Sequence, residues 1–173
     1  GRIRSPVGNH DPLMVPNNVY PSKGDDRWVS ISIYDEQEWQ SLVRVMGRPA
    51  WSRDRHFADK FRRKRNEERL DEHIAKWTKK RSHYEATKML QAEGVAAFPV
   101  MGVRELYSDP HWRARESWLQ IQHDLGPEWI YGVHWKFSDT PASVRTPTPL
   151  LGSHNHRIFG DLMGIGKHEL QRM

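Results

Sequence analysis

The sequence predicts an α+β fold, in which a few strands and about four helices lie between two irregular ends. Residues 27–34 alternate apolar and polar side chains, which is typical of a half-buried strand. Further along the chain, apolar residues recur at helical spacing behind residues that can cap a helix. Residues 1–26 and 138–173 are instead rich in proline and glycine and lack a core of their own.

The strand over residues 27–34 leads into a helix with clear signals at both ends. Asp35 can cap the start of this helix, and Glu38 is placed for the reciprocal contact. Gly47, followed by Pro49, ends the helical pattern. These signals predict a first helix that begins after Asp35 and ends before Gly47.

Two more helices are predicted after a basic stretch. Residues 60–65 are expected to form a basic connector, and Asn66 to cap the helix that follows it. Ser82 and Glu85 form a second capping box, and Gly94 closes the helix that this box opens. The central core, expected within residues 27–136, has these predicted members: Val29, Ile31, Ile33, Trp39, Leu42, Leu70, Ile74, Trp77 and Leu90.

The second half of the chain has shorter elements. Residues 96–101 predict a short buried strand or an extended segment, and residues 110–116 a short helix. Residues 118–123 and 129–133 alternate and predict a hairpin that turns across Gly126-Pro127. An extended connector and two closing helices are expected over residues 138–149, 152–163 and 167–173.

Composition and charge exclude several classes of protein. The chain has 173 residues, enough for one sizeable core, and a net charge of +5. That charge favours a polyanionic partner, either nucleic acid or a phosphorylated cofactor such as CoA. The absence of cysteine excludes a disulfide scaffold, a thiolate nucleophile and a cysteine-ligated zinc site. No apolar run approaches the roughly 20 residues of a membrane span, so we expect no membrane partner.

Three local features have both a functional and a structural interpretation. The basic residues 60–65 are compatible with nucleic-acid binding, but one short basic run is more often a solvated connector, and we expect no nucleic-acid partner. His154 and His156 lie two positions apart and do not share a helix face, so we expect no metal site. Residues 1–6 have neither an initiator methionine nor an apolar stretch, which we interpret as a cut inside a longer protein.

Eight short motifs follow one another along the chain. The first combines Gly-Asn-His at 8–10 with Tyr-Pro at 20–21 and Trp-Val-Ser-Ile at 28–31. The others are Gly-Arg-Pro at 47–49, Arg-Asp-Arg-His-Phe at 53–57, Arg65 with Asn66 and Leu70, Gly-Val at 94–95 with Pro-Val at 99–100, Asp-Pro-His-Trp-Arg at 109–113, Thr-Pro at 140–141, and Pro-Leu-Leu-Gly-Ser-His-Asn at 149–155. In order and spacing, these motifs resemble the C-terminal portion of family III CoA-transferases of the CaiB–BaiF type. Formyl-CoA transferase, carnitine CoA-transferase and alpha-methylacyl-CoA racemase are relatives within that family.

The resemblance implies where each part of the chain lies. Members of the family have a Rossmann-like large domain built from both chain ends and a smaller domain between them. Residues 1–26 would be an arm from the large domain, which this sequence lacks, and residues 27–137 the small α+β domain. Residues 138–173 would be a C-terminal arm whose helices return to the large domain. The resemblance also implies an interlocked homodimer in the cytoplasm.

The resemblance further implies a chemistry with an acyl-CoA and a carboxylic acid as substrates and no covalently bound cofactor. An aspartate of the large domain attacks the acyl-CoA thioester, CoA then returns to give an aspartyl-CoA thioester, and the acceptor acid is acylated. That aspartate lies before the first residue of this sequence, so we expect no catalytic residue in this chain. Two alternatives stay open: an acyl-CoA racemase of the same family, which uses a carboxylate and a histidine, or a non-catalytic binding module.

The candidate substrate loop consists of Gly8, Asn9, His10 and Asp11, which the resemblance places at the mouth of the active site. A structural interpretation is a linker in which Gly8 permits a tight turn. Formyl-CoA transferases have a run of glycines after the Gly-Asn pair, whereas here Asp11 is followed by Pro-Leu-Met. This difference speaks against oxalate chemistry by a glycine loop.

Overall fold

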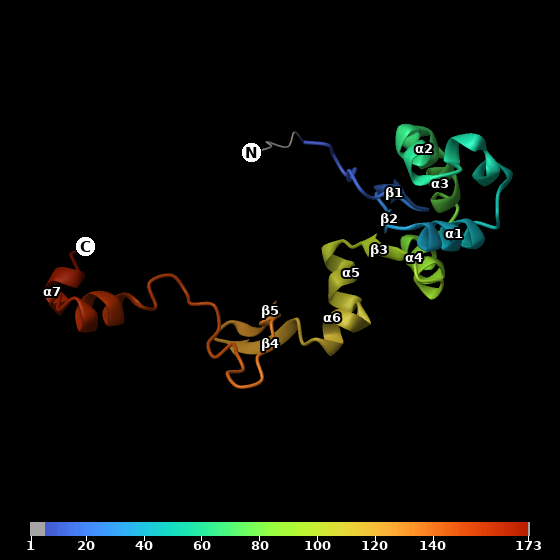
Figure 1. The fold of residues 1–173 in the computed structure, drawn as a ribbon. Helices are drawn as coiled ribbons and strands as arrows, with labels where there is room; N and C mark the ends of the chain where they lie inside the picture. The colour runs from blue at the N-terminus through green and yellow to red at the C-terminus, as the bar shows by residue number, and fades with distance from the viewer. Residues whose placement is uncertain (1–5, 173) are drawn as a thin grey trace. The chain divides into compact units, whose positions relative to one another are not determined.

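A computed structural model of the chain describes residues 6–172 (Figure 1). Its contacts divide the chain between Met101 and Gly102 into two compact units, each described here by itself. The expected boundaries at residues 26 and 137 refer to a complete family member and stay predictions. The described part of the chain has an α+β first unit and a second unit with a hairpin and several short helices.

A three-stranded antiparallel sheet forms the centre of the first unit. Its strands are β1 (Asn17–Pro21), β2 (Trp28–Ser32) and β3 (Ala96–Val100), in the order β1-β2-β3. In the register of the sheet, Val29 of β2 lies between Tyr20 of β1 and Pro99 of β3. The alternation in β2 places Val29 and Ile31 on the buried face of the sheet and Trp28 on the opposite face.

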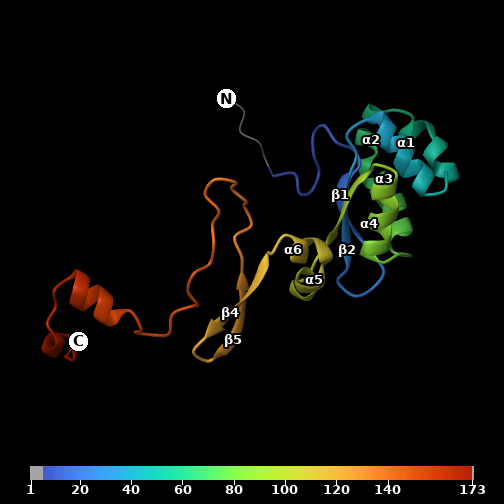
Figure 2. The same ribbon diagram turned by 90° about the horizontal axis from the view of Figure 1, so that it is seen from below.

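The helices of the first unit lie on the same side of this sheet (Figures 1 and 2). Two predicted caps are confirmed, because the Asp35 side chain accepts from the Glu38 amide at 2.9 Å and the Ser82 hydroxyl from the Glu85 amide at 3.1 Å. Asn66 is the residue before α3, as predicted, but its side chain makes no capping hydrogen bond. The helices are α1 (Glu36–Val45), α2 (Lys60–Arg65), α3 (Glu67–Thr78) and α4 (His83–Ala92), with 3-10 turns η1 (Ala50–Arg53) and η2 (Arg55–Phe57) between α1 and α2.

All nine predicted core residues are buried. The core also contains Val15 and Tyr20, which precede the predicted range. Among the described residues the last member of this core is Ala97, well short of the predicted limit at residue 136. Each large apolar side chain in this core contributes about 1.5–3 kcal/mol of burial free energy.

Two predictions for the first unit are corrected. Residues 1–26 were expected to be irregular throughout, yet β1 pairs with β2 along five residues. Proline does not prevent this, because Pro21 is the last residue of an edge strand, where a missing amide costs little. Residues 60–65 are not a connector but the helix α2, which the Asp59 side chain caps by accepting from the Arg62 amide.

The second unit contains α5 (Val103–Ser108), α6 (Pro110–Ala114), β4 (Trp118–His123) and β5 (Gly126–Tyr131). The predicted hairpin exists, but its turn is misplaced. Gly126 lies opposite His123 and Pro127 opposite Gln122, so both residues belong to β5 and the turn is Asp124-Leu125. The helix α5 was not predicted, because six residues are too few to show a helical period.

The end of the second unit has little regular structure. Residues 132–154 contain neither helix nor strand, and the closing helices are shorter than predicted: a π-helix η3 (His156–Leu162) and α7 (Lys167–Leu170). No residue from 132 to 172 is buried. The last predicted helical residue, Met173, and residues 1–5 lie outside the described residues. None of the helices described here is long and apolar enough to cross a membrane.

Candidate functional site

The predicted substrate loop begins with a tight turn. Gly8 has a φ of +66°, a conformation that glycine adopts at no steric cost, and the His10 amide donates across the turn to the Val7 carbonyl at 3.4 Å. The Asn17 side chain of β1 donates to the Asn9 carbonyl at 2.6 Å. The loop is therefore attached to the edge strand of the sheet rather than extended into solvent.

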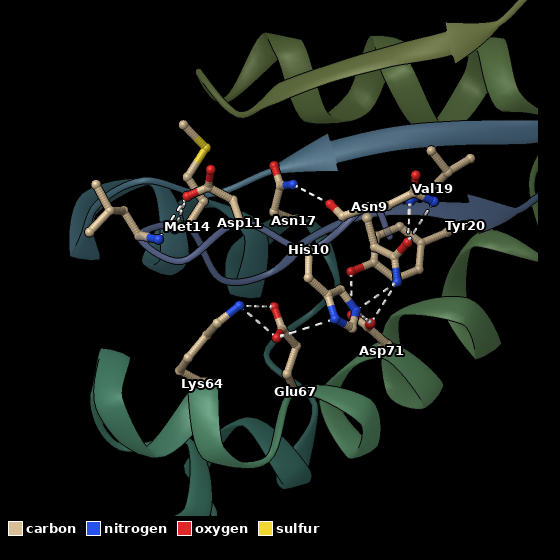
Figure 3. A network of polar contacts seen from close by, with 12 residues as sticks. Asn9, His10, Asp11, Met14, Asn17, Val19, Tyr20, Lys64, Glu67 and Asp71 are labelled. Carbon is tan, nitrogen blue, oxygen red and sulfur yellow. Dashed lines mark hydrogen bonds and ion pairs between the residues drawn. The ribbon is translucent and has the colours of Figure 1, made fainter. Parts of the chain in front are cut away.

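His10 connects the loop to helix α3. Its Nε2 lies 3.2 Å from an Asp71 carboxylate oxygen, and its Nδ1 lies 3.6 Å from a Glu67 carboxylate oxygen. Figure 3 shows the ring pointing toward the helix that carries these two carboxylates. The His10 side chain is 34% exposed, so one edge of the ring still faces solvent.

Asp71 is the centre of a polar network that it forms with His10, Asn18 and Tyr20. One of its oxygens accepts from the Tyr20 hydroxyl at 2.5 Å, and the other accepts from Asn18 Nδ2 at 2.7 Å (Figure 3). Burial, and then the negative charge of Asp71, raise the pKa of Tyr20 far above its usual value. Tyr20 therefore stays protonated and serves as a permanent donor to the carboxylate.

Glu67 has a partner of the opposite charge. Its two oxygens lie 2.8 and 2.6 Å from Lys64 Nζ, and its side chain is only 9% exposed. An open depression of about 450 Å³ lies beside this pair, lined by His10 and residues 64–69. His10, Lys64 and Glu67 thus line a hollow that contains both basic and acidic groups.

Local periodicity explains why these side chains meet. Asn18 and Tyr20 are two positions apart on β1 and share a face, while Glu67 and Asp71 are four apart on α3 and do the same. Sequence reasoning missed all four residues, although their spacing was visible. Periodicity alone was insufficient, because no feature of the nearby sequence indicates that the edge strand β1 lies against α3.

The four predicted loop residues have different surroundings. His10 and the Asn9 side chain converge on Asn18, with Asn9 Nδ2 donating to Asn18 Oδ1 at 3.3 Å. Asp11 points away from this network, because its Oδ1 accepts from the Leu13 and Met14 amides at 2.7 and 3.0 Å (Figure 3). Asp11 therefore fixes the shape of the loop and does not join the cluster.

Four other aspartates of the first unit also accept hydrogen bonds. Asp26 accepts from the Trp28 indole, and the other three cap helices. Within residues 6–172, no group of three or more His, Cys, Asp or Glu side chains is arranged to hold a metal ion. The capping aspartates are Asp35, Asp54 and Asp59, with Asp109 doing the same in the second unit.

Comparison with known proteins identifies the family. A family model described as CoA-transferase family III matches residues 1–155. The chain belongs to CoA-transferase family III. Succinyl-CoA–D-citramalate CoA-transferase of Chloroflexus aurantiacus is 34% identical over 171 residues, which cover 98% of this chain and 42% of that protein. Formyl-CoA:oxalate CoA-transferase of Bradyrhizobium diazoefficiens is 26% identical over 168 residues, covering 95% of this chain and 39% of that protein.

A solved family III structure has the same fold. The crystal structure of a CAIB/BAIF family protein from Brucella suis matches 92% of this chain and 41% of that one, with a TM-score of 0.73 at 23% identity. The chain therefore spans about two fifths of the length of these relatives (42% of the first of them).

Proposed function

We propose that this chain is the C-terminal part of a CoA-transferase that moves CoA between an acyl-CoA thioester and a carboxylic acid. The observation that carries the proposal is the family III match over residues 1–155. Both relatives named above are CoA-transferases, which favours transfer over racemisation. The activity belongs to the complete protein, in which a Rossmann-like large domain and an interlocked second subunit in the cytoplasm complete the site.

The proposed nucleophile is an aspartate outside this chain. A nucleophilic carboxylate needs an oxygen directed at the thioester carbon and free of competing donors. The carboxylate at the centre of the network, Asp71, has both oxygens engaged, one by Tyr20 and the other by Asn18. Asp11 and Asp35 each accept backbone amides of their own turn or helix. These contacts support a structural role for these three aspartates.

The loop from Gly8 to Asp11 is proposed to border the substrate. Its support is geometric: Asn9 and His10 are held by β1 and α3, so the loop presents a defined surface beside the open depression. Positioned groups of this kind lower the entropic cost of orienting a substrate. In this proposal His10 and Asn9 position the acceptor acid, and Asp11 maintains the turn that places them.

A chimera tests this proposal. Residues 1–155 would replace the matching segment of the Chloroflexus succinyl-CoA–D-citramalate transferase, and CoA transfer from succinyl-CoA would be measured with a panel of carboxylic acids. We expect transfer by the chimera and none by the 173-residue chain alone. An inactive chimera that folds and dimerises would count against the proposal. Exchange of the α-proton of an acyl-CoA without transfer would favour the racemase instead.

A further inference from the structure

A second depression in the first unit lies where α1 ends. It has a volume of about 270 Å³, the space of about nine water molecules in the liquid. Its lining comes from the last two turns of α1, the loop that follows and η1. Arg44, Arg48 and Arg53 are in this lining, and no acidic residue is among the described residues that form it.

The three guanidinium groups are accessible and can donate to a ligand. The Arg44 side chain is 44% exposed, and Arg48 and Arg53 are exposed as well. Within residues 6–172, neither the Arg48 nor the Arg53 side chain has a hydrogen bond or an ion pair. Arg44 contacts Ser41 Oγ at 2.8 Å and Glu93 at 3.5 Å, but it uses Nη2 for both. Its Nε and Nη1 therefore remain available.

The acceptors next to these arginines are already occupied. Asp54 directly follows Arg53, but its oxygens lie 2.7 Å from His56 Nδ1 and 3.1 Å from Arg69 Nη2. The last carbonyls of α1 accept from the amides of residues 46–48. The depression therefore gathers like charges that repel one another unless an anion lies between them.

The backbone fixes where Arg48 and Arg53 lie. Arg48 has a φ of +50°, in the left-handed region that residues with long side chains seldom adopt. Its amide donates to the Val43 carbonyl at 2.8 Å, which holds the loop against α1. The Ser52 hydroxyl donates to the Pro49 carbonyl at 2.7 Å within η1, and η1 ends at Arg53. The backbone positions of both arginines are thus set without a ligand.

The chemistry of this lining selects a phosphate group. A guanidinium fork matches two phosphate oxygens, and a phosphate monoester carries nearly two negative charges at neutral pH. A carboxylate or a phosphodiester carries only one. The lining has no open aromatic face for a base, because Trp39 is 2% exposed and the Arg63 guanidinium lies over its ring at 4.5 Å. The site therefore recognises the phosphate rather than the group attached to it.

We propose that the depression between the end of α1 and η1 binds the dianionic phosphate of a phosphate monoester. Arg44, Arg48 and Arg53 donate to its oxygens, and the attached group extends toward solvent. A free sugar phosphate and the ribose 3′-phosphate of CoA both present this group. The proposal does not rest on CoA transfer, because no lining residue belongs to the loop from Gly8 to Asp11 or to the polar network.

The first test compares three anions: methyl phosphate, dimethyl phosphate and acetate. Each is titrated at constant ionic strength and about pH 7.5 into the ¹⁵N-labelled chain, and the amide resonances of residues 44–53 are followed by NMR. For methyl phosphate we expect saturation with a dissociation constant on the order of 1 mM, as its size allows. Dimethyl phosphate and acetate should bind at least about tenfold more weakly, because each carries a single charge.

Arginine variants separate the site from the net charge of the chain. Arg48→Gln and Arg53→Gln each remove one donor fork and should weaken methyl phosphate binding by at least about fivefold. Both side chains are exposed, so the fold should be retained. Arg104→Gln is the matched control, because Arg104 is an exposed arginine of α5 outside the depression. This variant lowers the net charge equally and should leave binding unchanged.

CoA and dephospho-CoA, which lacks the 3′-phosphate, identify the source of the phosphate. Binding of CoA at least about tenfold tighter than methyl phosphate would identify CoA as the ligand, whereas equal binding would favour a free monoester. The proposal is wrong if dephospho-CoA binds residues 44–53 as tightly as CoA, or if acetate or dimethyl phosphate equals methyl phosphate. It is also wrong if Arg104→Gln weakens binding as much as Arg48→Gln, or if no anion shifts these amide resonances.

Discussion

Tyr20 links the edge strand to α3 through one hydrogen bond to a largely buried carboxylate. Tyr20→Phe keeps the ring and removes the donor, so Asp71 loses a charge-assisted partner. We expect the free energy of unfolding to fall by about 1.5–3 kcal/mol, measured by urea denaturation. Tyr34→Phe is the control, since the Tyr34 side chain is 57% exposed, and should change stability by less than about 0.5 kcal/mol. Equal effects of the two variants would contradict the role assigned to Tyr20.

Tyr20 also makes the stability of the folded chain depend on pH above about pH 10. The pKa of Tyr20 is raised in the folded chain from an ordinary value of 10.0, so its stabilising contribution is complete below pH 10 and is lost as the pH rises above it. The stability difference between the wild type and Tyr20→Phe should therefore be constant at neutral pH. Above pH 10 it should shrink by about 1.4 kcal/mol per pH unit. A constant difference up to about pH 11 would show that Tyr20 ionises normally.

Helix α2 resembles a nucleic-acid-binding segment in sequence, but in the structure basic side chains of this helix have acidic partners within the chain. Arg63 is buried and bonded to Glu36 at 2.6 Å, and Lys64 neutralises Glu67. Because these charges already form ion pairs within the chain, we expect nucleic acid to bind it with a dissociation constant above about 1 µM at physiological salt. Fluorescence anisotropy with a labelled duplex measures this, and a sub-micromolar dissociation constant would contradict it.

Sequence reasoning succeeded for elements whose signals are local. The caps at Asp35 and Ser82 and the apolar stripe of α3 depend on residues within a few positions, and each was placed correctly. The strand β1 was missed because its prolines suggested a loop, and only pairing with β2 shows that they lie at its ends.

The candidate site was less predictable than the fold. Its central contact joins His10 to Asp71, which are 61 positions apart. Periodicity indicates which side chains face inward, but it does not say which polar groups on different elements meet. His10 and Asn9 were named as candidates from the loop motif alone, and their partners on α3 required the tertiary structure.

At the scale of the whole chain, the two ends differ. Val15 and Tyr20 near the start are buried in the core, whereas no residue from 132 to 172 is buried. Limited trypsin digestion should therefore cut first after Lys136 or Arg145, while the segment from β1 to β3 survives. Mass spectrometry of the products identifies the sites. Cleavage inside the core before cleavage at the end, or uniform resistance, would contradict this assignment.

The central claim is that the covalent step of CoA transfer uses an aspartate outside these 173 residues. The most direct measurement is peptide mapping of the chimera after incubation with succinyl-CoA and trapping of the acyl or thioester adduct. We predict an adduct on an aspartate of the half that the Chloroflexus protein supplies, and unmodified Asp11, Asp35 and Asp71 in the half that this chain supplies. An adduct on any aspartate of this chain would contradict the account.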